Sequence, residues 1–167
     1  MIIRPEELKD QHAVFAVIQS AFETPAEANL VDILRRDAHP ILSLVAEQNE
    51  VIIGHVMFSP VSLTGHTDLK IMGLGPVAVD PEHQRLGIGT ALIKTGLEKC
   101  NKLGYGAVIV LGHQSYYPRF GFVPSVNYGI SSEYDVPPEV FMVMELQPGY
   151  LNDASGIIQY HPAFSGI

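Results

Sequence analysis

Two strand-like segments that flank an amphipathic helix place the strongest constraint on the fold of this chain. Residues 69–79, LKIMGLGPVAV, are typical of one strand, and residues 106–111, GAVIVL, are apolar at consecutive positions, as in a strand buried on both faces. Between them, residues 87–103 place Ile88 and Leu92 on one face of a helix and charged residues on the other. The order strand, helix, strand predicts a right-handed parallel crossover.

Two further helices are predicted upstream. From Leu8 to Phe22, apolar residues recur on one helical stripe, and acidic residues occupy the first turns, where the helix dipole favours them. A second helix is expected from Thr24 to about Asp37, because Thr24 as N-cap and Glu27 three residues later form a capping-box pattern.

The other apolar segments predict antiparallel strands. Residues 41–63 form two strands joined by a tight turn at Asn49 and Glu50, and residues 140–146 form another. With the crossover, these elements predict a mixed α/β fold of the α+β type, in which the sheet is mostly antiparallel and has one parallel β-α-β crossover.

Length and composition favour one domain over residues 1–167, with residues 148–167 as a tail of uncertain structure. No apolar run approaches the roughly 18 residues that a membrane span needs. The start, MIIRPEELKD, lacks the zones of a signal peptide, so we expect a cytoplasmic protein. The single cysteine, Cys100, cannot form an internal disulfide.

The charge of the chain argues against nucleic acid as a partner. Ten basic residues against eighteen acidic ones give a formal charge of -8, and the basic residues are scattered. A nucleic-acid-binding protein needs a basic face, so we exclude that class. An acidic surface is compatible with cationic substrates such as amines, although it is also common among soluble proteins.

The loop between the first strand of the crossover and its helix, residues 80–89, contains two glycines one residue apart. Ligands bind at the carboxyl ends of parallel strands, and the first amides of the following helix suit phosphate. A dinucleotide fingerprint needs a third glycine at Leu92 and a P-loop needs a lysine that GIGTAL lacks, so we exclude both. The remaining possibilities are a plain tight turn, or a short cradle in which Gly87 and Gly89 close around a pyrophosphate and Arg85 adds charge.

Pro76 interrupts the strand just before this cradle. Proline removes a donor from the ladder and is normally confined to an edge or a bulge. A strand that splays from its neighbour here would give a splayed central strand pair and leave the backbone groups of Val77, Ala78 and Val79 free to pair with an extended ligand. The alternative is an ordinary bulged strand.

These residues resemble the GNAT superfamily of acetyl-coenzyme A dependent N-acyltransferases. VAVDPEHQRLGIGTALI matches the family's acetyl-CoA motif, Gln/Arg-x-x-Gly-x-Gly/Ala, with Gln84, Gly87 and Gly89 at its fixed positions. YYPRFGF matches a second signature, Tyr-x-x-x-Gly-Phe, which starts at Tyr117. The resemblance covers roughly residues 1–147 and extends to the bacterial branch described as YhbS-like.

The resemblance implies an N-acetyltransferase that uses acetyl-CoA (coenzyme A) as cofactor and moves the acetyl group to a primary amine by direct attack in a ternary complex. No metal is expected. The pantetheine arm should pair with Val77, Ala78 and Val79. The pyrophosphate should lie on the loop and first helical turn, at Gln84, Arg85, Leu86, Gly87, Ile88, Gly89 and Thr90.

Acyl transfer needs groups that move protons and polarise the thioester. The N–H near Val77 is our candidate donor to the thioester carbonyl. Tyr117 fits the acid for the departing thiolate, because a phenol with an ordinary pKa of about 10 stays protonated at neutral pH. No carboxylate lies on strand 71–79, so for the base we expect a water relay, Glu27, which also has a structural reason as a capping residue, or His113 after the buried strand.

Other interpretations stay open. The chain could be a non-catalytic acyl-CoA-binding or regulatory module, which needs the cradle but no proton relay, or an acyltransferase with a longer acyl donor or a hydroxyl acceptor. We expect a small-molecule or protein amine as acceptor, no nucleic acid and no membrane; a homodimer is common in the family. His55, in the middle of a strand, is expected to be a hydrogen-bonded core histidine.

Overall fold

The computed structural model describes residues 1–166, which form two compact units. The first unit comprises residues 1–59, residues 75–98 and the described residues from 162, and the second comprises residues 60–74 and 99–161. None of the helices in the described part of the chain has the length and apolar character that a membrane span requires. The expectation of a single domain stays a prediction.

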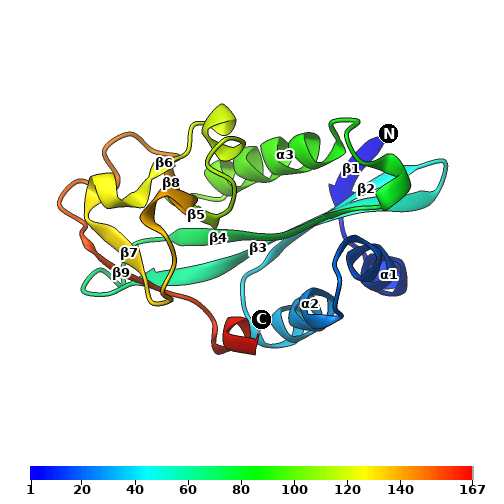
Figure 1. The fold of residues 1–167 in the computed structure, drawn as a ribbon, viewed down its shortest axis with the longest axis horizontal. Coiled ribbons are helices and arrows are strands. Elements are labelled where there is room, and N and C mark those ends of the chain that lie inside the picture. The colour runs from blue at the N-terminus through cyan, green and yellow to red at the C-terminus, as the bar shows by residue number, and fades with distance from the viewer. Residues whose placement is uncertain (167) are drawn as a thin grey trace. The chain divides into compact units, whose positions relative to one another are not determined.

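In the first unit, helices cover both faces of a sheet (Figure 1). The strands, in spatial order, are β1 (Ile2–Pro5), β2 (Leu42–Gln48), β3 (Val51–Leu63) and β4 (Ile71–Val79). The last residues of β3, from residue 60, and the first residues of β4, up to residue 74, belong to the second unit. The helices are α1 (Gln11–Ala21), α2 (Ala26–Asp37) and α3 (Ile88–Lys102), with 3-10 turns η1 (Leu8–Asp10) and η2 (Pro81–His83). Figure 1 shows α1 and α2 on one face of the strands and α3 on the other.

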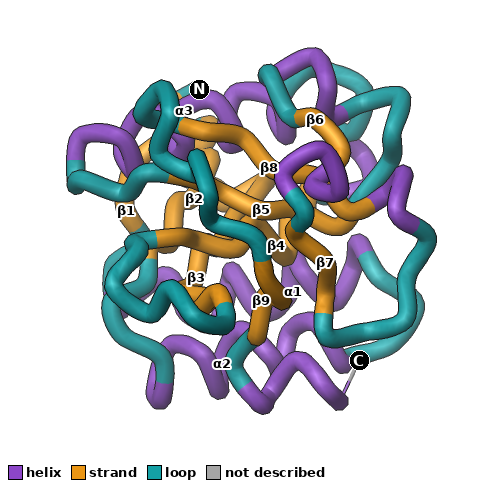
Figure 2. Tube along the Cα trace, turned by 90° about the vertical axis from the view of Figure 1, so that its left-hand side faces the viewer, coloured by secondary structure: helices purple, strands orange, loops and turns teal. Residues whose placement is uncertain are grey.

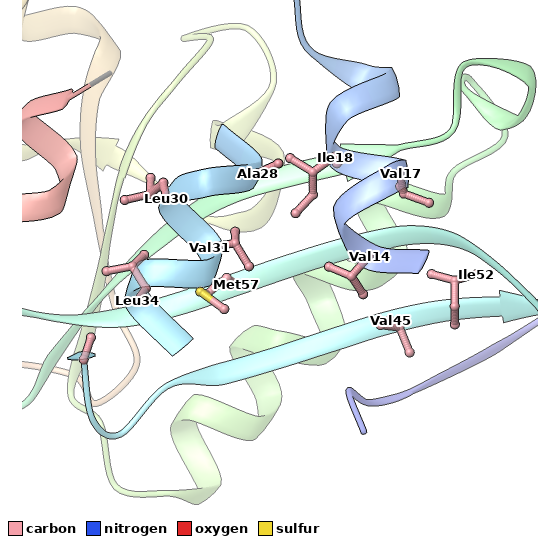
Figure 3. Close-up of a cluster of buried hydrophobic side chains, with 12 residues drawn as sticks. Val14, Val17, Ile18, Ala28, Leu30, Val31, Leu34, Val45, Ile52 and Met57 are labelled. Carbon is pink, nitrogen blue, oxygen red and sulfur yellow. The ribbon is translucent and has the colours of Figure 1, made fainter. Parts of the chain in front are cut away.

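The helices bury apolar stripes against this sheet. Figure 3 shows side chains of α1 and α2 pointing at the strand residues Val45, Ile52 and Met57. On the other face, a Cβ at Gly96 of α3 would overlap the ring of Phe58, so glycine is what allows the helix to approach the sheet there. The helical residues of the first core are Val14, Val17, Ile18, Ala28, Leu30, Val31 and Leu34.

The second unit is built around β5 (Ala107–Leu111). This strand pairs in parallel with residues 71–74 of β4 and antiparallel with β8 (Phe141–Glu145), which also pairs with β6 (Val123–Pro124). Figure 2 shows β5 and β8 as adjacent strands. The other strands, β7 (Ile130–Ser132) and β9 (Gly156–Gln159), pair in parallel with each other. The core of this unit comprises Val61, Leu63, Ile71, Ala107, Ile109, Ile130, Phe141, Val143, Leu151, Ala154 and Ile158.

The structure confirms the predicted fold class and the β4–α3–β5 crossover. The turn at Asn49 and Glu50 is also confirmed, since both residues have positive φ angles, 51° and 66°. The prediction of a helix from Leu8 is wrong at its start, because Leu8 is 82% exposed in η1 and α1 begins at Gln11. Neither β1 nor the parallel β7–β9 pair was predicted from the sequence.

The C-terminal tail, expected to be of uncertain structure, has defined structure in its described residues. It contains β9 and a 3-10 turn, η6 (Pro162–Gly166). Ala163 and Phe164 of η6 pack against the core of the first unit, and Figure 1 shows η6 beside α2. The tail therefore covers part of the apolar surface of α2.

A chain of polar side chains ties the N-terminal segment to α2 and the sheet. The Ser43 hydroxyl donates to Glu6 Oε1 at 2.9 Å, and Nε2 of His55 lies 2.8 Å from the Ser43 oxygen. Because the one hydroxyl proton goes to Glu6, Nε2 of His55 must be the donor, and Nδ1 is an acceptor without a partner among the described residues. Arg35 holds Glu6 from the other side, with Nη2 2.6 Å from Oε2. His55 is thus confirmed as a hydrogen-bonded core histidine.

His55 should make the stability of the fold depend on pH. Burial, and secondarily the charge of Arg35, lowers the pKa of His55 from 6.5 to about 3. As pH falls from 6.5 towards 3, the unfolded chain takes up a proton here that the folded chain does not, so stability that is full above pH 6.5 is progressively lost. We expect this group to lower the free energy of unfolding by about 1.4 kcal/mol per pH unit between roughly pH 6 and 4.

Urea unfolding of wild type and His55→Gln at a series of pH values tests this prediction. Glutamine keeps an N–H for Ser43 but does not titrate, so the gap between the two free energies of unfolding should change with pH by the expected slope. Asp10, whose pKa is lowered chiefly by its hydrogen bond from Arg4, contributes equally to both proteins. Two curves that run parallel would contradict the prediction.

Candidate functional site

The end of β4 presents a strand edge suited to an extended ligand. The parallel ladder with β5 ends at Leu74, just before Pro76, whereas β4 continues to Val79. Asp80 donates its backbone N–H to the carbonyl of Ile53 in β3 at 2.8 Å. Because backbone groups alternate in direction along a strand, the N–H and C=O groups of residues 77 and 79 point to the edge opposite β3.

The loop after β4 is fixed by its own side chains. Nε2 of Gln84 donates to the carbonyl oxygen of Val79 at 3.1 Å, so this predicted binding residue braces the loop against the strand. Nδ1 of His83 donates to the carboxylate of Asp80 at 2.6 Å and closes the η2 turn. This Asp80–His83 pair was not predicted from the sequence, although its i, i+3 spacing across a turn that begins with proline could have indicated it.

Helix α3 begins directly after the loop and presents its first amides. The first helical hydrogen bond runs from the N–H of Ala91 to the carbonyl of Gly87 at 3.0 Å, so the amides of Ile88 and Gly89 precede it and point out of the helix end. Gly87 has φ +83°, a left-handed conformation that favours glycine. Apart from its two chain neighbours, no residue in the described part of the chain has a heavy atom within 4 Å of the place that its Cβ would take. The backbone at Gly87 is therefore open at the positive end of a helix.

Gly89 joins this cradle to the strand edge. A Cβ at Gly89 would lie 3.7 Å from the Val79 side chain and 4.0 Å from that of Val77, which are ordinary contact distances. The helix start and the edge of β4 therefore lie side by side in the first unit. Arg85, with φ +65°, is exposed in the same loop and adds a positive charge. Ala78 contributes only backbone, because its side chain is buried in the core.

Tyr117 lies in an aromatic cluster of the second unit, at the start of η3 (Tyr117–Phe120). Its ring makes edge-on contacts with Tyr116 and Phe122, at centroid distances of 5.1 and 5.7 Å, and a tilted contact with Phe120 at 6.2 Å. Burial, and secondarily the neighbouring Tyr116, raises the pKa of Tyr117 to about 12. The phenol therefore stays protonated at neutral pH and can act as a hydrogen-bond donor.

His113 lies in the turn that leads to Tyr117. Its carbonyl accepts the N–H groups of Tyr116 and Tyr117, at 3.1 and 3.2 Å, and its side chain is exposed. The structure thus brings the backbone of His113 to Tyr117 within the second unit, and the turn depends on that backbone.

Glu27 lies in the first turn of α2 but does not cap it. The helix begins at Ala26, and its N-cap residue, Pro25, makes no capping hydrogen bond through a side chain. The N–H of Ala26 donates a long hydrogen bond of 3.3 Å to the Thr24 hydroxyl. Oε1 of Glu27 is buried and has no hydrogen-bond partner in residues 1–166. The predicted capping box is therefore wrong, and the structural reason that remains for an acid in this first turn is the helix dipole.

A cavity of about 780 Å³ lies elsewhere in the first unit, against α1, β1, the start of β3 and the η2 turn. Three of its charged groups pair with one another: Arg4 lies 2.7 Å from Asp10 and 2.9 Å from Glu47. None of the predicted site residues lines it. Among residues 1–166, no cluster of three or more His, Cys, Asp or Glu side chains could hold a metal ion.

Comparison with known proteins gives a consistent result. Residues 8–122 match the model of the Acetyltransferase (GNAT) family. The N-acetyltransferase YhbS of Escherichia coli is 37% identical over 166 residues, 99% of each chain, and YjhQ of the same organism is 42% identical over 123 residues, 71% of this chain and 68% of that protein.

Two solved structures show the same fold at substantial identity. The crystal structure of E. coli YhbS in complex with CoA has a TM-score of 0.93 at 36% identity and covers 98% of this chain and 91% of that one. A GNAT family acetyltransferase from Brucella melitensis in complex with acetyl-CoA has a TM-score of 0.80 at 33% identity and covers 98% and 97%.

Proposed function

Because the chain belongs to the acetyltransferase (GNAT) family, we propose that it transfers the acetyl group of acetyl-CoA to a primary amine by direct attack in a ternary complex. The observation that carries this proposal is the closeness of Gly89, at the helix N-terminus, to the side chains of Val77 and Val79 on β4. The complexes of the E. coli and Brucella relatives with CoA and acetyl-CoA support the choice of cofactor.

The first unit offers groups that suit both parts of coenzyme A. The outward amides at the start of α3 and the charge of Arg85 suit a pyrophosphate, since a helix N-terminus favours anions. The open space at Gly87 leaves room for it. The edge formed by Val77 and Val79 suits the pantetheine arm, which would pair with it as an added strand. Gln84 contributes by holding the loop against Val79.

Backbone groups of β4 would also polarise the reacting carbonyl. Acetyl-CoA supplies the acetyl thioester when it is bound. The N–H of Val77 faces the edge beyond the end of the β4–β5 ladder and is our candidate donor to the carbonyl oxygen, on which negative charge develops during attack. Such a donor acts from a fixed position and needs no proton transfer of its own.

Proton transfer needs an acid for the thiolate and a base for the amine. Tyr117 is the proposed acid, because its raised pKa keeps the phenol protonated across the neutral range. Glu27 is the first candidate for the base, directly or through water, because it has a buried carboxylate oxygen without a partner in the described chain. His113 is the second, because its imidazole is exposed next to the turn of Tyr117. A cytoplasmic location and a homodimer stay predictions.

The proposal is tested with the purified protein, acetyl-CoA and a panel of small amines and lysine-containing peptides, with released thiol as the readout. We expect acetyl-CoA to raise the melting temperature and at least one amine to support turnover. Stabilisation without turnover on any amine would favour a non-catalytic acyl-CoA-binding module instead. Neither stabilisation nor turnover would overturn the proposal.

A negative charge introduced at Gly87 should weaken the binding of acetyl-CoA without destabilising the fold. Asn and Asp both tolerate the left-handed conformation at this position and have nearly the same shape. Gly87→Asp should therefore raise the KM for acetyl-CoA at least about 10-fold relative to Gly87→Asn, because only the aspartate repels a pyrophosphate within a few ångströms. An acid at a helix start is favourable, so the melting temperature of the free aspartate variant should equal or exceed that of the asparagine variant.

The Gly87→Asn protein is the matched control, and the difference between the two KM values should shrink as salt is added. Equal KM values for the two variants would mean that no anion binds at this helix start.

A further inference from the structure

We propose that Gly112 is a positioning residue that seats the ring of Tyr117 for proton transfer. This inference rests on the proposed function, in which Tyr117 is the acid. Gly112 directly follows β5, and its N–H donates to the carbonyl of Val140 at 2.9 Å. The backbone on which the ring lies is thus anchored to the chain segment that leads into β8.

The ring of Tyr117 occupies the place of a side chain at Gly112. A Cβ at Gly112 would lie 2.8 Å from Cδ2 and 3.2 Å from Cζ of Tyr117, and closer still to Cε2. Carbon atoms that are not bonded to each other do not approach so closely. The backbone of Gly112 is not among those with positive φ, so its conformation alone would accept alanine. What excludes a side chain at this position is the tyrosine ring.

Three other aromatic rings contact the ring of Tyr117, so moving the ring has a cost in packing. Tyr116 and Phe122 contact it edge-on and Phe120 at a tilt. Phe122 is buried, which makes it a fixed wall. A methyl group at Gly112 would push the ring away from the β5 end and against these neighbours. The hydroxyl, which is bonded to Cζ, would move with the ring, and proton transfer is sensitive to displacements of about 1 Å.

The other end of β5 provides a matched control. Gly106 precedes the strand, and a Cβ there would overlap the ring of Tyr150 as a Cβ at Gly112 would overlap Tyr117. The Tyr150 hydroxyl accepts the N–H of Lys70 at 2.7 Å, which is a structural role. Alanine at Gly106 and at Gly112 therefore imposes the same kind of clash, against a structural tyrosine in one case and the proposed acid in the other.

Steady-state kinetics of the full chain with the amine found above test the proposal. Gly112→Ala should lower kcat by at least about 10-fold and leave the KM for acetyl-CoA within about 2-fold of wild type. Gly106→Ala should lower the melting temperature and leave kcat within about 2-fold. The proposal is overturned if Gly112→Ala retains wild-type kcat, or if Gly106→Ala loses as much.

A readout that does not depend on activity is the ¹⁹F NMR spectrum of protein labelled with 3-fluorotyrosine. The resonance missing from Tyr117→Phe identifies Tyr117, and Gly112→Ala should shift that resonance more than any other. In a Tyr117→Ala background, alanine at Gly112 should cause no further loss of melting temperature, because the ring is gone. The positioning role of Gly112 would be overturned if the Tyr117 resonance did not shift, or if Gly112→Ala lowered the melting temperature equally in the wild-type and Tyr117→Ala backgrounds.

The two proposals fail in distinguishable ways. If Tyr117→Phe retains wild-type kcat, the acid role fails and the positioning role fails with it. If Tyr117→Phe is impaired while Gly112→Ala retains wild-type kcat, the proposed function stands and only the role of Gly112 is overturned.

Discussion

Replacing Tyr117 with phenylalanine should lower kcat about 100-fold and leave the KM for acetyl-CoA within about 2-fold of wild type. The substitution removes the phenol oxygen and keeps the ring, so the contacts with Tyr116 and Phe122 persist. Without the hydroxyl, the thiolate must leave without a proton from the protein. Because the pKa of Tyr117 is raised to about 12, its ionisation should not limit kcat anywhere near neutral pH.

Tyr116→Phe is the matched control for this experiment. The residue is adjacent in sequence and in the same aromatic cluster, but it lies outside the family signature. We expect its kcat to stay within about 2-fold of wild type. Equal losses in the two variants, or a parallel loss of acetyl-CoA binding in Tyr117→Phe, would contradict the acid role.

The Arg35→Met variant should have the largest effect on stability, lowering the free energy of unfolding by about 3 kcal/mol or more. The side chains of Arg35 and Glu6 are only 15% and 6% exposed and meet at 2.6 Å. Methionine fills similar space but leaves the Glu6 carboxylate in the interior without its counter-ion. Urea unfolding at neutral pH measures the loss.

The neighbouring Arg36→Met is the control, because both arginines lie in the last turn of α2 and both substitutions remove one positive charge. Arg36 is 70% exposed and 3.5 Å from Asp37, so its loss should change stability by less than about 1 kcal/mol. Adding Glu6→Gln to Arg35→Met should recover part of the stability. Similar losses at both arginines would show that the charge of α2, rather than the buried pair, is what matters.

Periodicity was sufficient to predict the elements with long apolar patterns. The β4–α3–β5 crossover follows from two apolar runs around an amphipathic helix, and the structure confirms it. In contrast, β1 has only four residues, ends in Pro5 and is half exposed, so no alternation marks it as a strand. Its pairing with β2 depends on tertiary contact, and local sequence carries no signal for such contact.

In the candidate site, too, some features follow from local sequence and others depend on tertiary contact. The role of Pro76 at the end of the ladder and of Gly87 in a left-handed turn follow from backbone chemistry, which sequence reveals directly. Other features depend on where side chains point after the chain has folded. They are the hydrogen bond from Gln84 to Val79, the carboxylate oxygen of Glu27 without a partner in the described chain, and the packing of the Tyr117 ring on Gly112. Residue type and spacing do not determine those directions.

The segmented make-up of the first unit has a consequence for how the protein is made. Its core draws on the N-terminal helices, the β4–α3 region and Phe164 of η6. A ribosome adds residues in order, and N-terminal regions generally fold first. Here α1 and α2 emerge early, but Phe164, which packs against the core that α2 helps to form, emerges only after the whole second unit. Part of the apolar surface of these helices therefore stays exposed on the nascent chain until Phe164 has been added. During this interval a chaperone would be able to bind that surface.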